Sequence, residues 1–234
     1  MTKYIDRYYL NWEEYGIKFG GWWRQPWANT IAYYPLTSTT TVNDMSWNSK
    51  TLTNYSSVSF GTQGWVDCAT FNGSNYLEIS SQTLNLTEFT MSCWVRWTNA
   101  NTRGFLWIWK FNTPYQCMAM LKETGGLDID KMMISPYADA AYSSSATVSN
   151  TWYNVIGIYT NGKYTTYLNS QEWGSRSYNI NISWNSNVLR VWYAATGEPK
   201  MYWQLSNVIF EDKARTAQEI SDYYDQTKSL YGIS

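Results

Sequence analysis

The sequence predicts an all-β protein with a single short helix near the C-terminal end. Runs of β-branched, aromatic and aliphatic residues recur along most of the 234 residues. Several of them alternate between apolar and polar positions, as half-buried strands do. Glycine and asparagine turns separate the runs at roughly 8 to 15 residues, a spacing that indicates a sandwich or barrel.

The clearest strand spans residues 88–98 and is predicted to lie in the middle of a sheet. Its apolar positions, Phe89, Met91, Cys93 and Val95, alternate with Thr90, Ser92, Trp94 and Arg96. This period of two places one face in the core. The second face carries an aromatic side chain and a cation, so it is suited to a ligand or a partner.

Residues 1–28 are predicted to form an N-terminal arm, and residues 29–234 the sandwich. Two strand-like runs, 4–10 and 15–19, flank a polar turn and indicate a β-hairpin. Three tryptophans follow within residues 22–27. An isolated hairpin is marginally stable in water. We therefore expect the arm to pack on its own domain, or to dock on another copy or a larger assembly.

The remaining elements are predicted from the same alternation and from turn signals. Residues 37–59 are rich in Thr, Ser and Asn and indicate a loop, a short strand and a loop, and residues 138–149 indicate an exposed loop. A hairpin is expected at 152–169, where Asn161 and Gly162 separate two runs. The other strands are expected at 30–36, 67–71, 75–80, 104–111, 115–121, 131–135, 178–183, 188–193 and 201–210.

The helix is predicted from a capping box. Thr216 and Glu219 have the spacing at which the hydroxyl accepts the fourth residue's amide N–H and the carboxylate reaches back. Ile220, Tyr223 and Tyr224 follow on one side, and Gly232 ends the segment. This helix closes the domain rather than starting a new one.

Composition narrows the function classes. The net charge of −1 gives no electrostatic attraction to nucleic acid or anionic lipid. The chain has no histidine, which removes the usual general base near neutral pH and the commonest metal ligand. Aromatic residues make up 18% of the chain and charged residues 15%. That is more aromatic surface than one core normally needs.

The cellular location is predicted from the first residues of the sequence, from its apolar runs and from its cysteines. Cys68, Cys93 and Cys117 are expected to be buried free thiols, with a single disulfide as the alternative. The first residues carry acids and no apolar region, so no classical signal peptide is expected. No apolar run approaches the roughly 18 residues of a membrane span. We expect cytoplasmic synthesis followed by display on a virion or another extracellular surface, by a route such as release of phage particles by lysis.

Five stretches, taken in order, resemble the concanavalin A-like lectin/glucanase superfamily, in its laminin-G-like branch. They are residues 31–36 with 43–46, residues 69–77 (ATFNGSNYL), residues 89–95 (FTMSCWV), residues 152–155 through 167–169, and residues 205–210 with 214–220. They span about 30 to 225 and leave the arm outside. The resemblance implies a jelly-roll β-sandwich, a fold that hosts lectins, hydrolases and structural modules. Similar domains occur in phage virion and surface proteins.

Two departures from that family bear on chemistry. Members often carry an acidic residue, sometimes tied to calcium, where this chain has Ser206 and Asn207. No cofactor is therefore expected. Asp44 is predicted to be a turn-forming residue, and the alternative is that it binds calcium together with backbone carbonyls. The hydrolases use a run of three carboxylates. Only Asp128 and Asp130 approach it, and a solvated loop edge is their alternative reading.

The sequence therefore predicts a protein that is not an enzyme and that binds a glycan or another surface ligand. Trp94 and Arg96 are the first candidate ligand-binding residues, and Trp107 and Trp109 come next. The alternative for the tryptophans is burial in the core or under the arm. A structural assembly protein that self-associates in a capsid, tail or filament is the second functional hypothesis, and a glycan hydrolase is the third.

Overall fold

A computed structural model describes residues 29–46, 48–98, 103–110, 117–123, 131–135, 141–142, 147–177, 182–191 and 202–234. For 80–85, 103–110, 117–123, 131–135, 141–142, 182–188 and 190 it describes only the backbone. The predicted arm, residues 1–28, lies outside the described residues and stays a prediction.

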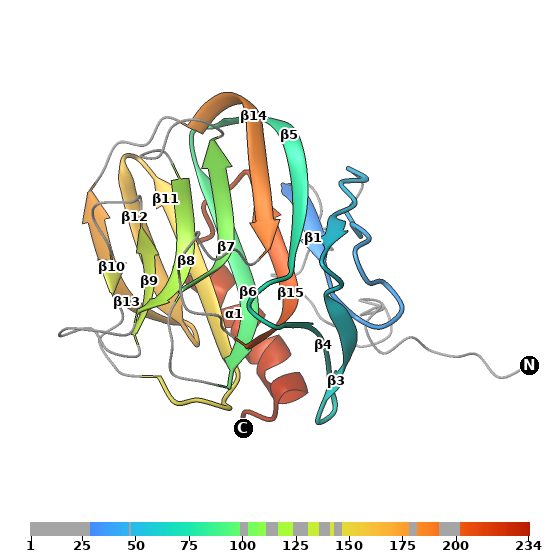
Figure 1. Cartoon of the computed structure of the whole chain (residues 1–234). Helices are drawn as coiled ribbons and strands as arrows, with labels where there is room; N and C mark the ends of the chain where they lie inside the picture. The colour runs from blue at the N-terminus through green and yellow to red at the C-terminus, as the bar shows by residue number, and fades with distance from the viewer. Residues whose placement is uncertain are drawn as a thin grey trace, which may run out of the picture.

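The described strands form two antiparallel sheets that stack face to face (Figure 1). The first sheet has eight strands. Seven of them are hydrogen-bonded in one continuous order, and the eighth, β1, pairs with β15, which also pairs with β4. In path order they are β13 (Gln171–Ser177), β12 (Lys163–Leu168), β11 (Tyr153–Thr160), β6 (Phe89–Trp97), β15 (Trp203–Glu211), β4 (Val66–Phe71) and β3 (Ser59–Gln63), with β1 at Thr30–Tyr34.

The second sheet has seven described strands, and all of its pairings are antiparallel. In path order they are β10 (Ala141–Tyr142), β9 (Lys131–Ser135), β8 (Cys117–Glu123), β7 (Arg103–Lys110), β14 (Ile182–Val191), β5 (Tyr76–Leu86) and β2 (Thr53–Tyr55). The predicted all-β sandwich is confirmed.

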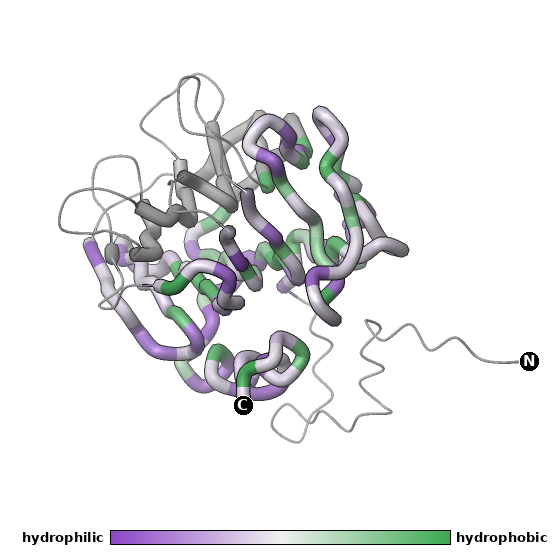
Figure 2. Tube along the Cα trace, turned by 60° about the horizontal axis from the view of Figure 1, so that its bottom comes forward, coloured by the Kyte–Doolittle hydropathy of each residue, from purple (hydrophilic) through white to green (hydrophobic). Residues whose placement is uncertain are grey.

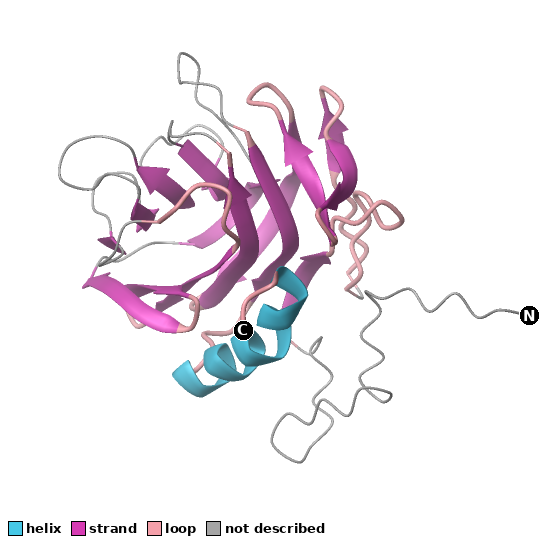
Figure 3. Ribbon diagram, turned by 90° about the horizontal axis from the view of Figure 1, so that it is seen from below, coloured by secondary structure: helices cyan, strands magenta, loops and turns pink. Residues whose placement is uncertain are grey.

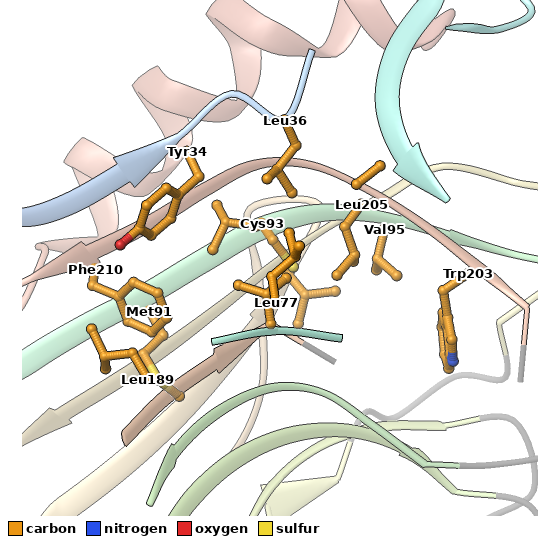
Figure 4. Close-up of a cluster of buried hydrophobic side chains, with 14 of the residues drawn as sticks. Tyr34, Leu36, Leu77, Met91, Cys93, Val95, Leu189, Trp203, Leu205 and Phe210 are labelled. Carbon is orange, nitrogen blue, oxygen red and sulfur yellow. The ribbon is translucent and has the colours of Figure 1, made fainter. Parts of the chain in front are cut away.

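Strand β6 lies inside the first sheet, between β11 and β15, as its alternation predicted. Its residues Met91, Cys93 and Val95 have no exposed surface and belong to the core between the sheets. Leu77 and Leu189 reach this core from the second sheet (Figure 4). Each such side chain stabilises the fold by about 1.5–3 kcal/mol relative to its exposed state. Figure 2 shows the alternation as changes of colour along the strands.

The predicted hairpin at 152–169 is confirmed, because β11 and β12 pair from Val155 to Thr160. Asn161 and Gly162 form its two-residue turn with φ of 50° and 69°. Positive φ at both positions is what the favoured hairpin turn requires, and asparagine and glycine adopt it most readily. The tight turn fixes the register of both strands.

The C-terminal helix is also confirmed. Helix α1 (Ala217–Thr227) begins after Thr216, whose hydroxyl accepts from the Glu219 N–H at 3.2 Å. Glu219 Oε2 in turn accepts from the Thr216 N–H at 2.9 Å. A 3-10 helix, η2 (Lys228–Tyr231), follows and ends at Gly232 with φ of 74°. Within the described part of the chain, no helix combines the length and apolar character that crossing a membrane requires.

Helix α1 covers the outer face of the first sheet, opposite the second sheet (Figure 3). Ile220 is fully buried and packs with Ile156, Ile158 and Tyr167 of β11 and β12. The first sheet is therefore covered on both faces over much of its width. This explains why even the hydroxyl residues on the second face of β6, Thr90 and Ser92, are buried.

Some elements differ from the sequence predictions. The polar edge strand β13 was not predicted, because half-exposed and exposed residues hide its alternation. Strand β10 lies inside the stretch expected to be an exposed loop. Cys68 and Cys93 are buried free thiols, as expected, and burial raises the pKa of the Cys68 thiol to about 11.

Candidate functional site

Trp94 lies on the predicted face of β6, but this face is covered at its position. The expectation that it stands on an accessible surface is corrected, because its side chain is 0% exposed. The indole stacks on the Tyr231 ring, with centroids 3.9 Å apart and planes 7° from parallel, and Tyr224 stacks at 5.9 Å. Burial was the alternative left open for this tryptophan. The cover is the C-terminal segment, which belongs to no strand of the sandwich.

Hydrogen bonds hold the C-terminal segment in place over Trp94. The Tyr231 hydroxyl donates to Ser206 Oγ at 3.0 Å and accepts from Asn207 Nδ2 at 2.6 Å. The Tyr33 hydroxyl donates to Asn207 Oδ1 at 2.7 Å. Burial raises the pKa of the Tyr231 phenol well above its usual value, so it stays a donor. Ser206 and Asn207 thus anchor this segment.

A pocket of about 330 Å³ lies beside this anchored segment, on the outer side of the first sheet. We call it the Arg96 pocket. It is formed by the β3–β4 hairpin tip (63–66), by Arg96 of β6, by residues 150–152 before β11 and by residues 231–233 after η2. Four segments that are far apart in the sequence therefore contribute to it.

Arg96 is held in a fixed orientation by neutral oxygen atoms. Its Nε donates to the Asn150 carbonyl at 3.2 Å, and its Nη2 donates to Asn150 Oδ1 at 2.9 Å. Its Nη1 donates to Gln204 Oε1 at 2.8 Å. Asn150 has a φ of 63°, a conformation that asparagine adopts more readily than most residues. The Asn150 side chain and backbone together orient the guanidinium.

Trp65 is the exposed aromatic side chain of the pocket. It occupies the two-residue turn between β3 and β4, after Gly64, whose φ is 67°. The ring is 69% exposed, and its Nε1 donates to the Leu230 carbonyl at 3.1 Å. It lies so close to Gly232 that a Cβ there would be 2.7 Å from the ring. The indole is thus held on one side and accessible on the other.

Sequence reasoning identified Arg96 but missed Trp65. The available signal was a tryptophan directly after a glycine, between two alternating runs, which is the position of a turn residue. Trp107 and Trp109 lie on β7, which belongs to the second sheet and does not pair with β6. Their side chains, and Asp128 and Asp130, lie outside the described side chains. The four predicted ligand residues therefore do not share one sheet.

Asp44 makes four hydrogen bonds within its own part of the chain. Its Oδ1 accepts from the N–H groups of Tyr33 and Ser46 at 2.9 and 2.8 Å. Its Oδ2 accepts from Ser46 Oγ and from the Lys50 N–H, both at 2.8 Å. This arrangement fits a turn-forming aspartate. A calcium ion at Asp44 would have to displace these donors, and no cluster of three candidate ligands occurs among the described residues.

The groups that line the Arg96 pocket are suited to binding a ligand that has both an apolar face and polar groups. It offers an indole face for apolar C–H groups, together with the amide groups of Gln63 and Asn150 and one cation. Retaining glycoside hydrolysis needs two carboxyl groups about 5 Å apart. Among the described residues, no aspartate or glutamate lines the pocket.

Comparison with known families supports this architecture. A family model described as the concanavalin A-like lectin/glucanases superfamily matches residues 71–221. The chain belongs to that superfamily. The match spans more than half of the chain and confirms the resemblance read from the five stretches. No curated protein sequence matches the chain.

Solved structures of this superfamily fold resemble the chain at low identity. Domain 4 of AbnA, a GH43 extracellular arabinanase from Geobacillus stearothermophilus solved with arabinotriose, has a TM-score of 0.68 and 12% identity over 83% of this chain and 97% of that one. The binding domain of Paraclostridial Mosquitocidal Protein 1 has a TM-score of 0.69 and 13% identity over 88% and 55%. The Botulinum Neurotoxin Type G receptor binding domain has a TM-score of 0.63 and 13% identity over 86% and 52%.

The chain therefore spans nearly all of the arabinanase domain but only about half of the two toxin binding domains. At these identities the likeness establishes the fold. Two of these structures are binding domains, and the third is a domain in complex with arabinotriose.

Proposed function

We propose that this chain is a non-catalytic recognition module that binds a glycan in the Arg96 pocket. The observation that carries the proposal is the exposed, anchored indole of Trp65 beside the oriented Arg96 and Asn150. A sugar ring presents an apolar C–H face to an indole and hydroxyl groups to amides. The arabinotriose bound to the similarly folded domain 4 of AbnA supports a sugar ligand.

The test is a glycan array followed by calorimetry on the glycans that bind. Trp65→Ala removes the stacking surface, and we expect it to weaken affinity about tenfold, since aromatic contacts contribute on the order of 1 kcal/mol beyond burial. Tyr202→Ala is the matched control, because this tyrosine is 48% exposed and does not line the pocket. An array without any binder, or equal affinities for the two variants, would contradict the proposal.

We further propose that the module is displayed on a phage virion or another extracellular surface through residues 1–28. The support is the tryptophan-rich composition of this segment and its position before the family match, which begins at residue 71. Sedimentation of the full chain and of a chain lacking 1–28 tests this role. We expect the full chain to self-associate and the shortened chain to be a monomer. Identical monomers would refute attachment through the arm.

A purely structural assembly protein is the second candidate function, and the tryptophan-rich composition of residues 1–28 favours it equally. The two candidates differ in the effect of Trp65→Ala. A structural protein keeps all of its measurable associations in this variant, whereas a recognition module loses glycan affinity and keeps its assembly state.

A further inference from the structure

We infer that the ligand of the Arg96 pocket is an acidic sugar whose carboxylate binds Arg96. The inference rests on the proposed glycan-binding function and adds the chemical class of the ligand. It is carried by the charge balance of the pocket and by the donors that Arg96 still has available.

The charge balance comes first. The three hydrogen bonds that Arg96 forms with described residues end on amide oxygens, those of Asn150 and Gln204. Among the described residues, Arg96 forms no ion pair, and no carboxylate lines the pocket. Within the described part of the chain, no ion pair compensates the charge of this half-buried guanidinium, which lines the cavity. Amide oxygens orient a cation without cancelling its attraction for an anion.

The remaining donors come second. A guanidinium carries five N–H groups. Three of them donate to Asn150 and Gln204, and the other two, one on Nη1 and one on Nη2, have no acceptor among the residues that the structure describes. A planar carboxylate can accept from two N–H groups of one guanidinium, and such charge-assisted bonds are about twice as strong as neutral ones. A hydroxyl of a neutral sugar uses one donor and leaves the charge uncompensated.

The position of Trp65 completes the argument. The indole and Arg96 line the same cavity of about 330 Å³, which has room for one or two sugar rings. An acidic sugar has an apolar ring face and a carboxylate attached to the same ring. Stacking on Trp65 and pairing with Arg96 therefore use two different parts of one sugar residue.

The test combines a change in the ligand with a change in the protein. The probes are trigalacturonate and 3′-sialyllactose, their methyl esters, and neutral galactotriose and lactose, each measured by calorimetry with the full chain. Esterification removes the negative charge and leaves the ring unchanged. We expect the better acidic probe to bind at least about tenfold more tightly than its ester, as the loss of a charge-assisted pair implies.

The protein change is Arg96→Gln, with Arg96→Lys as the charge-preserving variant. We expect the acid and its ester to bind Arg96→Gln with equal affinity, while Arg96→Lys keeps part of the preference for the acid. Because each ratio compares two ligands on one protein, a moderate loss of stability in a variant does not affect it. Unfolding curves of both variants identify the folded temperature range.

The outcomes separate this inference from the function on which it rests. Equal binding of acid and ester by the wild-type protein overturns the assignment of an acidic ligand and leaves glycan binding intact. A preference for the acid that survives in Arg96→Gln overturns the role of Arg96. Tighter binding of sulfated lactose than of either carboxylate overturns the carboxylate assignment. No binding of any acidic or neutral probe overturns the acidic-sugar inference, whereas an array without any binder overturns glycan binding as well.

Discussion

Tyr231→Phe removes a single oxygen atom from the buried hydrogen-bond network that holds the C-terminal segment. The hydroxyl donates to Ser206 Oγ and accepts from Asn207 Nδ2. Each bond contributes about 1 kcal/mol net, and Asn207 is left with a half-buried donor lacking this acceptor. The ring itself, and its stacking at 3.9 Å on Trp94, are retained. We therefore expect a loss of about 2 kcal/mol of unfolding free energy.

The assay is calorimetric or fluorescence-monitored thermal unfolding of the purified chain. For a domain of this size, 1 kcal/mol shifts the Tm by about 2–4 °C, so Tyr231→Phe should lower it by about 4–8 °C. Tyr202→Phe is the matched control, because it removes the same atom from a side chain that is 48% exposed, and we expect no change. Equal Tm values for the two variants would refute the role assigned to the network.

Four further perturbations test other parts of the structure. Burial raises the pKa of Tyr231, so its contribution to the free energy of unfolding is present below pH 10 and is lost at higher pH, where this tyrosine ionises in the unfolded chain. Between pH 9 and 11, urea unfolding should therefore show that Tyr231→Phe loses about 1.4 kcal/mol less unfolding free energy than the wild-type protein. Equal losses in the two proteins would contradict this. Thr216→Ala breaks the capping box and should cost about 1 kcal/mol by urea unfolding, against no cost for an exposed Ser→Ala control. Asp44→Asn should lower the free energy of unfolding by about 2 kcal/mol, because it weakens the hydrogen bonds that this carboxylate accepts. Millimolar calcium should leave the Tm of the wild-type protein unchanged, and a clear rise in that Tm would identify a metal site. Gly232→Ala places a Cβ at a residue with a φ of 74° and against the Trp65 ring, so it should lower the free energy of unfolding by about 1 kcal/mol or more. It should also weaken glycan affinity in calorimetry, and an unchanged affinity would exclude Trp65 from the site.

The sequence predicted the elements that are determined by short-range patterns. Alternation from Phe89 to Val95 predicted a central strand, Asn161 and Gly162 predicted a hairpin, and the spacing of Thr216 and Glu219 predicted the start of α1. In each case the signal lies within about ten residues, where local stereochemistry decides the structure.

The site could be predicted only in part, because its environment is set by distant residues. Alternation correctly placed Trp94 and Arg96 on the same face of β6, opposite the core between the sheets. It could not show that Tyr231, which lies far along the sequence, covers Trp94 and leaves Arg96 beside a pocket. Trp65 was missed because its exposure depends on the turn and on its contact with Gly232.

The Arg96 pocket forms only when segments that lie far apart in the sequence have folded together. One wall comes from residues 63–66 and another from residues 231–233, so neither half of the polypeptide can assemble the cavity alone. During synthesis, the sandwich strands emerge before the last wall does. Removal of residues 231–233 would leave the described strands of both sheets uncut but delete that wall. Under the proposed function, glycan binding would therefore report whether a given molecule is fully folded.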